Sequence, residues 1–183
     1  MKKPVLTAAV AMLTLAACNK TETTGVETNE ATAGNDLINE ANGLSTAEVD
    51  TAFVGEAMQG DNAEVAIGRL AVAQGASQSV KNFGKMLVDD HGAHKEKLKA
   101  LALTAGLPVT DDPSAEGKSN LEKLQALRGD AFDKQFKTMM VEDHTKDIAK
   151  YEKQAESNDS ETAALAKETL PTLRKHLEAA NAL

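Results

Sequence analysis

The chain has one cysteine, no tryptophan, one tyrosine and four phenylalanines among its 183 residues. A single cysteine excludes a disulfide within the chain. Aromatic residues make up 3% of the sequence, which disfavours a β-sandwich because its strands prefer aromatic and β-branched residues. Basic residues are outnumbered, and the formal charge of −8 argues against binding to a nucleic-acid backbone. What remains favours one domain of packed helices with an aliphatic core.

The cysteine ends a short apolar segment near the N-terminus. Two lysines precede residues 5–17, and this stretch is shorter than the roughly 20 apolar residues that a transmembrane helix needs. Such a pattern is typical of a secretory signal peptide. The tetrapeptide Leu-Ala-Ala-Cys that ends at Cys18 resembles the bacterial lipobox, whose cysteine is lipidated after cleavage. We therefore expect a signal peptide over 1–17 and a lipid anchor on Cys18.

The segment after the cysteine has no apolar period. Residues 19–45 are rich in Thr, Glu, Asn, Gly and Ala, and such a segment cannot bury enough apolar surface to offset its ordering entropy. We expect a lipidated N-terminus and flexible tether over 18–45 and a folded domain over 46–183. Asn19 stands where an aspartate would favour the inner membrane in Gram-negative sorting, so the expected location is the bacterial cell envelope, at the outer membrane and facing the periplasm. The membrane is the one partner that the sequence indicates.

Beyond residue 45, apolar residues recur with the 3.6-residue period of a helix. The pattern predicts long helices over 46–75, 78–105, 130–156 and 160–181. Ser45 or Thr46 offers a cap for the first and Ser77 a cap for the second. No segment has the alternation of a strand, so the sequence predicts an all-α, up-and-down four-helix bundle.

Two prolines mark further features of this pattern. Asp112 and Pro113 offer an N-cap and a first-turn proline for one extra short helix. Pro171 lies inside the last helical pattern, where it should kink the helix or mark its true start. The residues predicted to be buried in the core are Phe53, Phe83, Leu87, Leu98, Phe132, Phe136 and Leu173.

Six ionisable residues fall on the apolar faces, where such groups are seldom buried without partners. They are Glu64, His91, His94, His144, Asp147 and His176. Two pairs are spaced i, i+3, His-x-x-His and His-x-x-Asp, and side chains at this spacing point the same way. Metal sites in helical bundles combine such pairs with single ligands from the other two helices. We therefore predict a divalent metal site, for Zn, Fe, Cu or Ni, since imidazole suits each of these metals.

Each candidate also has a structural interpretation. A lone inward histidine is more often a hydrogen-bonded core residue, and Glu64 can pair with Arg69 or a lysine. Asp147, and Asp143 on the same stripe, become ordinary solvated residues if their helix rotates slightly. His176 lies nearest a chain end and fits a common depth least well. Asp90, at the edge of its face, can orient a histidine without being a metal ligand.

Four sequence blocks cover residues 53–64, 80–91, 131–133 and 170–177, and the last has the pattern Leu-Pro-x-Leu-x-x-His-Leu. Together they resemble a widespread bacterial envelope family of unknown function. Its members are described as ferritin-like and are labelled as outer-membrane proteins. The resemblance covers about residues 50 to 181 and implies a ferritin-like four-helix bundle, without an established reaction. Di-iron ferritins carry a Glu-x-x-His pair on each of two helices, and the different pairs here argue against iron oxidation.

Two classes of function follow from these features. The first is an envelope lipoprotein that binds a divalent metal ion for sequestration or stress protection. The second is a non-catalytic structural or interaction protein of the envelope, whose buried polar cluster only fixes helix packing. An oxidase ranks third. The sequence offers no nucleophile–base arrangement and no glycine-rich phosphate loop, so it predicts no catalytic residue.

Overall fold

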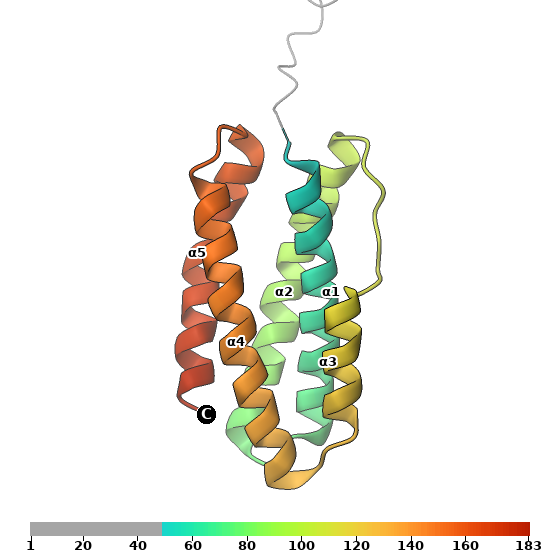
Figure 1. Cartoon of the computed structure of the whole chain (residues 1–183), viewed down its shortest axis with the longest axis vertical. Helices are drawn as coiled ribbons and strands as arrows, with labels where there is room; N and C mark the ends of the chain where they lie inside the picture. Colours follow the sequence, from blue (N-terminus) through green and yellow to red (C-terminus); the bar gives the residue numbers. More distant parts are fainter. Residues whose placement is uncertain (1–48) are drawn as a thin grey trace, which may run out of the picture. The chain divides into compact units, whose positions relative to one another are not determined.

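The computed structural model describes residues 49–183, so the predicted signal peptide, Cys18 and the tether lie outside the described residues. The described part is all-helical, with five helices and no strand. The helices are α1 (Thr51–Gln74), α2 (Gln78–Thr104), α3 (Ala115–Gln125), α4 (Gly129–Ala155) and α5 (Ser160–Asn181) (Figure 1). For residues 49–183, the prediction of an all-α fold with four long helices and a short one is confirmed. Among the described helices, none combines the length and apolar character needed to cross a bilayer.

Short polar side chains set the start of three helices. Asp50 accepts a hydrogen bond from the Phe53 amide at 2.9 Å, so α1 begins at Thr51. The predicted start at residue 46 is wrong, because Val49 and Asp50 are not helical. Ser77 caps α2 as predicted, accepting from the amide of Val80.

The later helix starts correct two expectations. Ser114, and not Asp112, caps α3 by accepting from the amide of Gly117 at 3.0 Å. Pro113 therefore precedes the helix instead of occupying its first turn. Helix α5 begins at Ser160 and runs through Pro171, so the proline does not mark its start. A proline inside a helix removes one backbone hydrogen-bond donor, and α5 continues through it.

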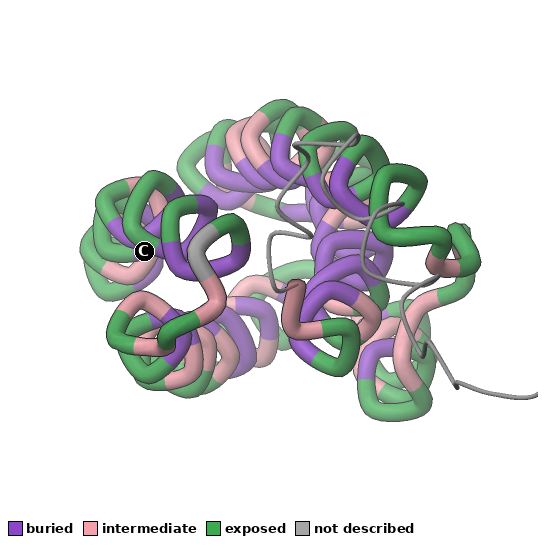
Figure 2. Tube along the Cα trace, turned by 90° about the horizontal axis from the view of Figure 1, so that it is seen from above, coloured by how far each residue is buried: buried purple, intermediate pink, exposed green. Residues whose placement is uncertain are grey.

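The helices associate as two hairpins. Helices α1 and α2 lie side by side, as do α4 and α5, and the short α3 packs on α1 (Figure 1). Gly68 and Gly84 allow the close approach of α1 to α2, because a Cβ on either would lie 2.7 Å from the carbonyl oxygen of the other. Contacts of α2 with α5 and of α1 with α4 join the two hairpins. Seen from above, the buried stretches of the helices face one another (Figure 2).

The buried apolar residues form two clusters, one at each end of the helices. The first contains Phe53, Val54, Leu98, Tyr151 and Leu173 among others, and the second contains Ile67, Phe83, Leu87, Phe136 and Met140 among others. All seven residues predicted for the core are buried. Along α2 and α4, the passage from one cluster to the other occurs at histidines: His91 follows Leu87, and His144 follows Met140. The fold thus holds a polar layer between two apolar clusters.

Replacing Phe83 by alanine is expected to lower the free energy of unfolding by about 3 to 5 kcal/mol, because it empties an enclosed site. The Phe83 side chain is 3% exposed and its ring contacts that of Phe136 edge-on at 5.8 Å. Urea unfolding followed by circular dichroism measures the loss. Val72→Ala, at a residue 44% exposed, is the control and should change stability little. Equal stability of the two variants would contradict the described packing.

Candidate metal centre

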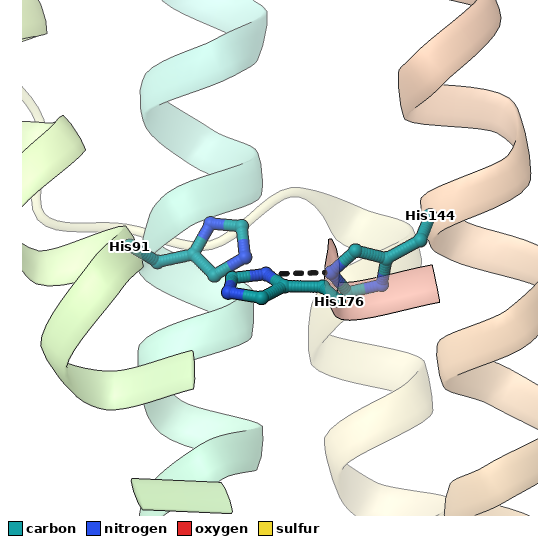
Figure 3. A group of neighbouring side chains, drawn as sticks. All are labelled: His91, His144 and His176. Carbon is teal, nitrogen blue, oxygen red and sulfur yellow. Dashed lines mark hydrogen bonds between the residues drawn. The ribbon is translucent and has the colours of Figure 1, made fainter. Parts of the chain in front are cut away.

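Three histidines from three helices meet in the polar layer. His91 of α2, His144 of α4 and His176 of α5 are each at most 5% exposed. One ring nitrogen from each lies within 4.8 Å of the other two, and within residues 49–183 this is the one group of His, Cys, Asp or Glu side chains with that property. Figure 3 shows the three rings pointing toward one another. We call these residues the histidine group.

Hydrogen bonds at the far side of two rings fix where their protons lie. The Nδ1 of His144 donates to the carbonyl oxygen of Met140 at 2.9 Å. The Nε2 of His176 donates to the Asp90 carboxylate at 2.9 Å. A carbonyl or carboxylate oxygen can only accept, so each of these nitrogens carries the proton of its neutral ring. The inward nitrogen of each ring is therefore an unprotonated acceptor.

The two inward nitrogens face each other. The Nε2 of His144 lies 3.2 Å from the Nδ1 of His176, the pair joined by the dashed line in Figure 3. Two lone pairs at this distance repel unless a positive charge lies between them. Either one ring takes up a second proton or a cation binds both nitrogens. This arrangement therefore favours a proton or a metal ion between the two buried rings.

A buried aspartate positions the third ring. Asp61 of α1 is 4% exposed and accepts from the Nδ1 of His91 at 2.9 Å and from the Nδ1 of His94 at 2.8 Å. The Nε2 atoms of both histidines are buried without a hydrogen-bond partner among the described residues. No other described group therefore competes for the Nε2 of His91, which can act as a ligand of the histidine group once it loses its proton. Asp61 was not among the predicted site residues, although it lies three positions before Glu64 and shares its face of α1.

The protonation of the group follows from burial and from these partners. Burial, with the neighbouring charges of His91 and His176, lowers the pKa of His144 to about 3. Burial also lowers the pKa of His176, and its bond to Asp90 offsets part of this effect. Burial acts in the same direction on His91, but the hydrogen bond to Asp61 and the nearby carboxylates outweigh it and raise the pKa to about 9. At neutral pH His144 and His176 are therefore neutral, whereas His91 is cationic and carries a proton on each ring nitrogen.

Carboxyl groups beside the histidine group are also perturbed. Burial raises the pKa of Glu64 to about 8, and the Oε2 of this residue has no hydrogen-bond partner within the described chain. Burial and the neighbouring Asp147 raise the pKa of Asp143 to about 6. Burial raises the pKa of Asp147 as well. A cation nearby would favour the charged form of each carboxyl group.

The structure brings together part of the predicted ligand set. His91, His144 and His176 belong to the histidine group, whereas Glu64, His94 and Asp147 lie outside it. His94 instead shares Asp61 with His91. From its position near the chain end, His176 was expected to match the depth of the other ligands along the bundle least well. It nevertheless lies at the centre of the site. Asp90 accepts a hydrogen bond from His176, which agrees with its interpretation as a residue that can orient a histidine.

Comparison with known proteins gives a family match and no closer relative. A family model described as "Domain of unknown function (DUF4142)" matches residues 37–183. No curated protein and no solved structure matches the chain.

Proposed function

The chain belongs to the DUF4142 family, a domain of unknown function, and we propose that its helical domain binds one divalent transition-metal ion through His91, His144 and His176. The orientation of the three rings carries this proposal. Each ring donates a proton outward, to Asp61, Met140 or Asp90. The inward nitrogens of His144 and His176 are thereby left unprotonated, and the Nε2 of His91 becomes the third ligand when the ion displaces its proton.

The hydrogen bonds around the group are those that metal-binding histidines usually make. Such a histidine donates its second N–H to a carboxylate or a backbone carbonyl, which fixes its tautomer and its orientation. Two nitrogens bound to a tetrahedral ion at 2.0 to 2.1 Å are about 3.3 Å apart, close to the 3.2 Å between His144 and His176. The carboxylates of Asp61 and Asp90 offset the charge of a divalent ion.

The donor set selects the class of metal. Neutral imidazole favours Zn, Cu, Ni or Fe over Mg or Ca, which prefer oxygen ligands. The three rings are enclosed within the helical domain, so an ion held there would exchange slowly with solvent. We propose sequestration of the metal, or protection of the envelope from metal stress, as the role of such a site.

Calorimetric titration of the metal-free, untagged chain with Zn²⁺ tests this function. We expect one ion per chain, and Asp61→Asn should weaken binding about 10-fold to 100-fold, because such supporting partners contribute that much to metal affinity. Asp89→Asn is the matched control, since Asp89 is exposed and pairs with Lys85 on the surface of α2. Equal Zn²⁺ affinity of both variants and the parent would count against the proposed geometry.

We place this domain in the bacterial envelope on the strength of the N-terminal sequence. The lysines before the apolar segment and the Leu-Ala-Ala-Cys tetrapeptide support cleavage before Cys18 and lipid attachment there. The four long helices support an up-and-down, ferritin-like bundle formed by α1, α2, α4 and α5, with α3 as the extra helix. The expected arrangement is a lipid-anchored bundle at the outer membrane that faces the periplasm.

Replacing Cys18 by serine is expected to release the domain from membranes or to leave an uncleaved precursor, because a serine hydroxyl cannot form the thioether that attaches the lipid. Fractionation of cells followed by mass measurement of the N-terminus checks both results. Thr21→Ser in the neighbouring segment is the control and should mature normally. The anchor would be disproved if the Cys18 variant sedimented with membranes at the mature mass.

A structural role without metal is the second candidate. The bonds of His176 to His144 and to Asp90 join α5 to both α4 and α2, and one shared proton would satisfy them. In that case the polar layer serves only to fix helix packing, in a structural or interaction protein of the envelope. This function predicts a domain whose stability does not respond to metal ions.

A further inference from the structure

A second cluster of ionisable groups lies in a cavity on the side of the domain where α3 packs. The cavity has a volume of about 120 Å³ and is lined by residues of α1, α3 and α4. Four carboxyl groups line it, those of Glu64, Glu116, Asp143 and Asp147. None of the three histidines of the histidine group is part of this lining.

Glu64 is the buried member of this cluster. It is 5% exposed, and its Oε2 finds no hydrogen-bond partner among the described residues. A carboxyl group buried without a partner is costly unless a cation or a donor compensates it. Because Glu64 lines the cavity, a ligand within the cavity can supply that compensation.

The lysines near the cavity, one of which, Lys146, lines it, pair with glutamates. Lys146 pairs with Glu116 at 3.1 Å, and Lys150 pairs with Glu56 on the surface. Within residues 49–183, no salt bridge reaches Glu64, Asp143 or Asp147. The two aspartates are spaced i, i+4 on α4 and share one side of that helix. Three carboxyl groups therefore line one cavity without an ion-pair partner of their own, although the charges of His91 and Lys146 lie nearby.

We propose that this cavity is a second cation site, held by Glu64, Asp143 and Asp147, for a hard divalent cation such as Ca²⁺ or Mg²⁺ that keeps part of its water shell. The donors are all oxygen atoms, which these cations prefer. The carboxylates do not converge as closely as the histidine group does, so water must complete the shell. The cavity has room for several waters, because one water needs only about 10 to 15 Å³ of such volume.

The carboxylate cavity and the histidine group select different metals. Imidazole nitrogens favour transition metals, whereas a carboxylate and water shell favours hard cations. An ion in the histidine group would be balanced by Asp61 and Asp90, which contact its ligands. The carboxyl groups in the cavity would not be ligands of that ion. The two sites therefore use separate ligands.

Titration calorimetry of the untagged full chain with Ca²⁺ tests this proposal. We expect one Ca²⁺ ion per chain, and Glu64→Gln should weaken its binding at least tenfold by removing a carboxyl group that becomes a charged ligand when the cation binds. Glu142→Gln is the matched control, because Glu142 is an exposed residue of α4 and should leave the Ca²⁺ affinity unchanged. Asp147→Asn is a second variant at a less buried position and should weaken Ca²⁺ binding in the same way.

A variant of the histidine group separates the two sites. His144→Ala should lose Zn²⁺ and keep Ca²⁺, whereas Glu64→Gln should lose Ca²⁺ and keep Zn²⁺, which also shows that it folds. The proposal is overturned if neither Ca²⁺ nor Mg²⁺ binds at millimolar concentration, or if Glu64→Gln and Asp147→Asn bind Ca²⁺ like the parent. Loss of Ca²⁺ from His144→Ala would also overturn it, since the cation would then occupy the histidine group.

Discussion

Replacing both His91 and His144 by alanine is expected to abolish stoichiometric binding of Zn²⁺ and of other transition metals. Two of the three inward nitrogens are then gone, and His176 alone cannot hold an ion. The parent should gain about 4 kcal/mol of stability when free metal is 1,000 times its dissociation constant. The double variant should gain none. Thermal unfolding with and without Zn²⁺, with circular dichroism as a check on folding, measures the difference.

His94→Ala is the informative control for this experiment. His94 is buried and lies one helical turn from His91, yet its Nδ1 bonds to Asp61 and it stands outside the histidine group. It should therefore keep one Zn²⁺ ion per chain. A double variant that still binds Zn²⁺ with the parent's affinity, or a His94 variant that loses it completely, would contradict the assigned ligands.

Metal affinity is expected to rise about tenfold for each pH unit between pH 6 and 9, because the ion must displace one proton from His91. In the metal-free domain, Asp61 and nearby carboxylates outweigh burial and raise the pKa of His91 from its ordinary 6.5 to about 9. His144, with a pKa of about 3, and His176, with a lowered pKa, are already neutral there. Unperturbed histidines would instead confine the loss of affinity to the region near pH 6.

Calorimetry in two buffers of different ionisation enthalpy counts the protons released on binding. We expect one proton per Zn²⁺ ion at pH 7. Without metal, the raised pKa of His91 makes the stability of the fold decrease as the pH rises. The His91–Asp61 pair stabilises the fold fully below pH 6.5, and this stabilisation is lost as the pH rises through about 9. Zn²⁺ binding without proton release at pH 7 would show that His91 is not the protonated ligand.

The helices could be predicted from the sequence because their apolar residues follow one period over many turns. The helix starts were harder to predict, since several short polar residues near each boundary can serve as the N-cap. Ser114 caps α3 although Asp112 and Pro113 offered an equally plausible signal. Likewise, Asp50 caps α1 five residues beyond the first candidate. Which residue caps depends on how the preceding loop packs, and the periodicity does not contain this information.

The candidate site could be predicted as a set of inward residues but not as a set of ligands. All four histidines are buried, as their positions on the apolar faces indicated. His91 and His94 share a face, however, and only packing against α4 and α5 determines which of them meets His144. The depth of His176 was misjudged from its distance to the chain end. Asp61 was missed because a buried carboxylate between two histidines is recognisable only once α1 and α2 are paired.

Elemental analysis of the untagged chain, purified without chelator, tests the central claim most directly. The account predicts one transition-metal ion per chain, retained through gel filtration and absent from the His91→Ala, His144→Ala double variant prepared in parallel. A parent chain that carries no stoichiometric metal, and whose melting temperature does not rise with Zn, Cu, Fe or Ni, would contradict the account and leave the polar layer with a packing role alone.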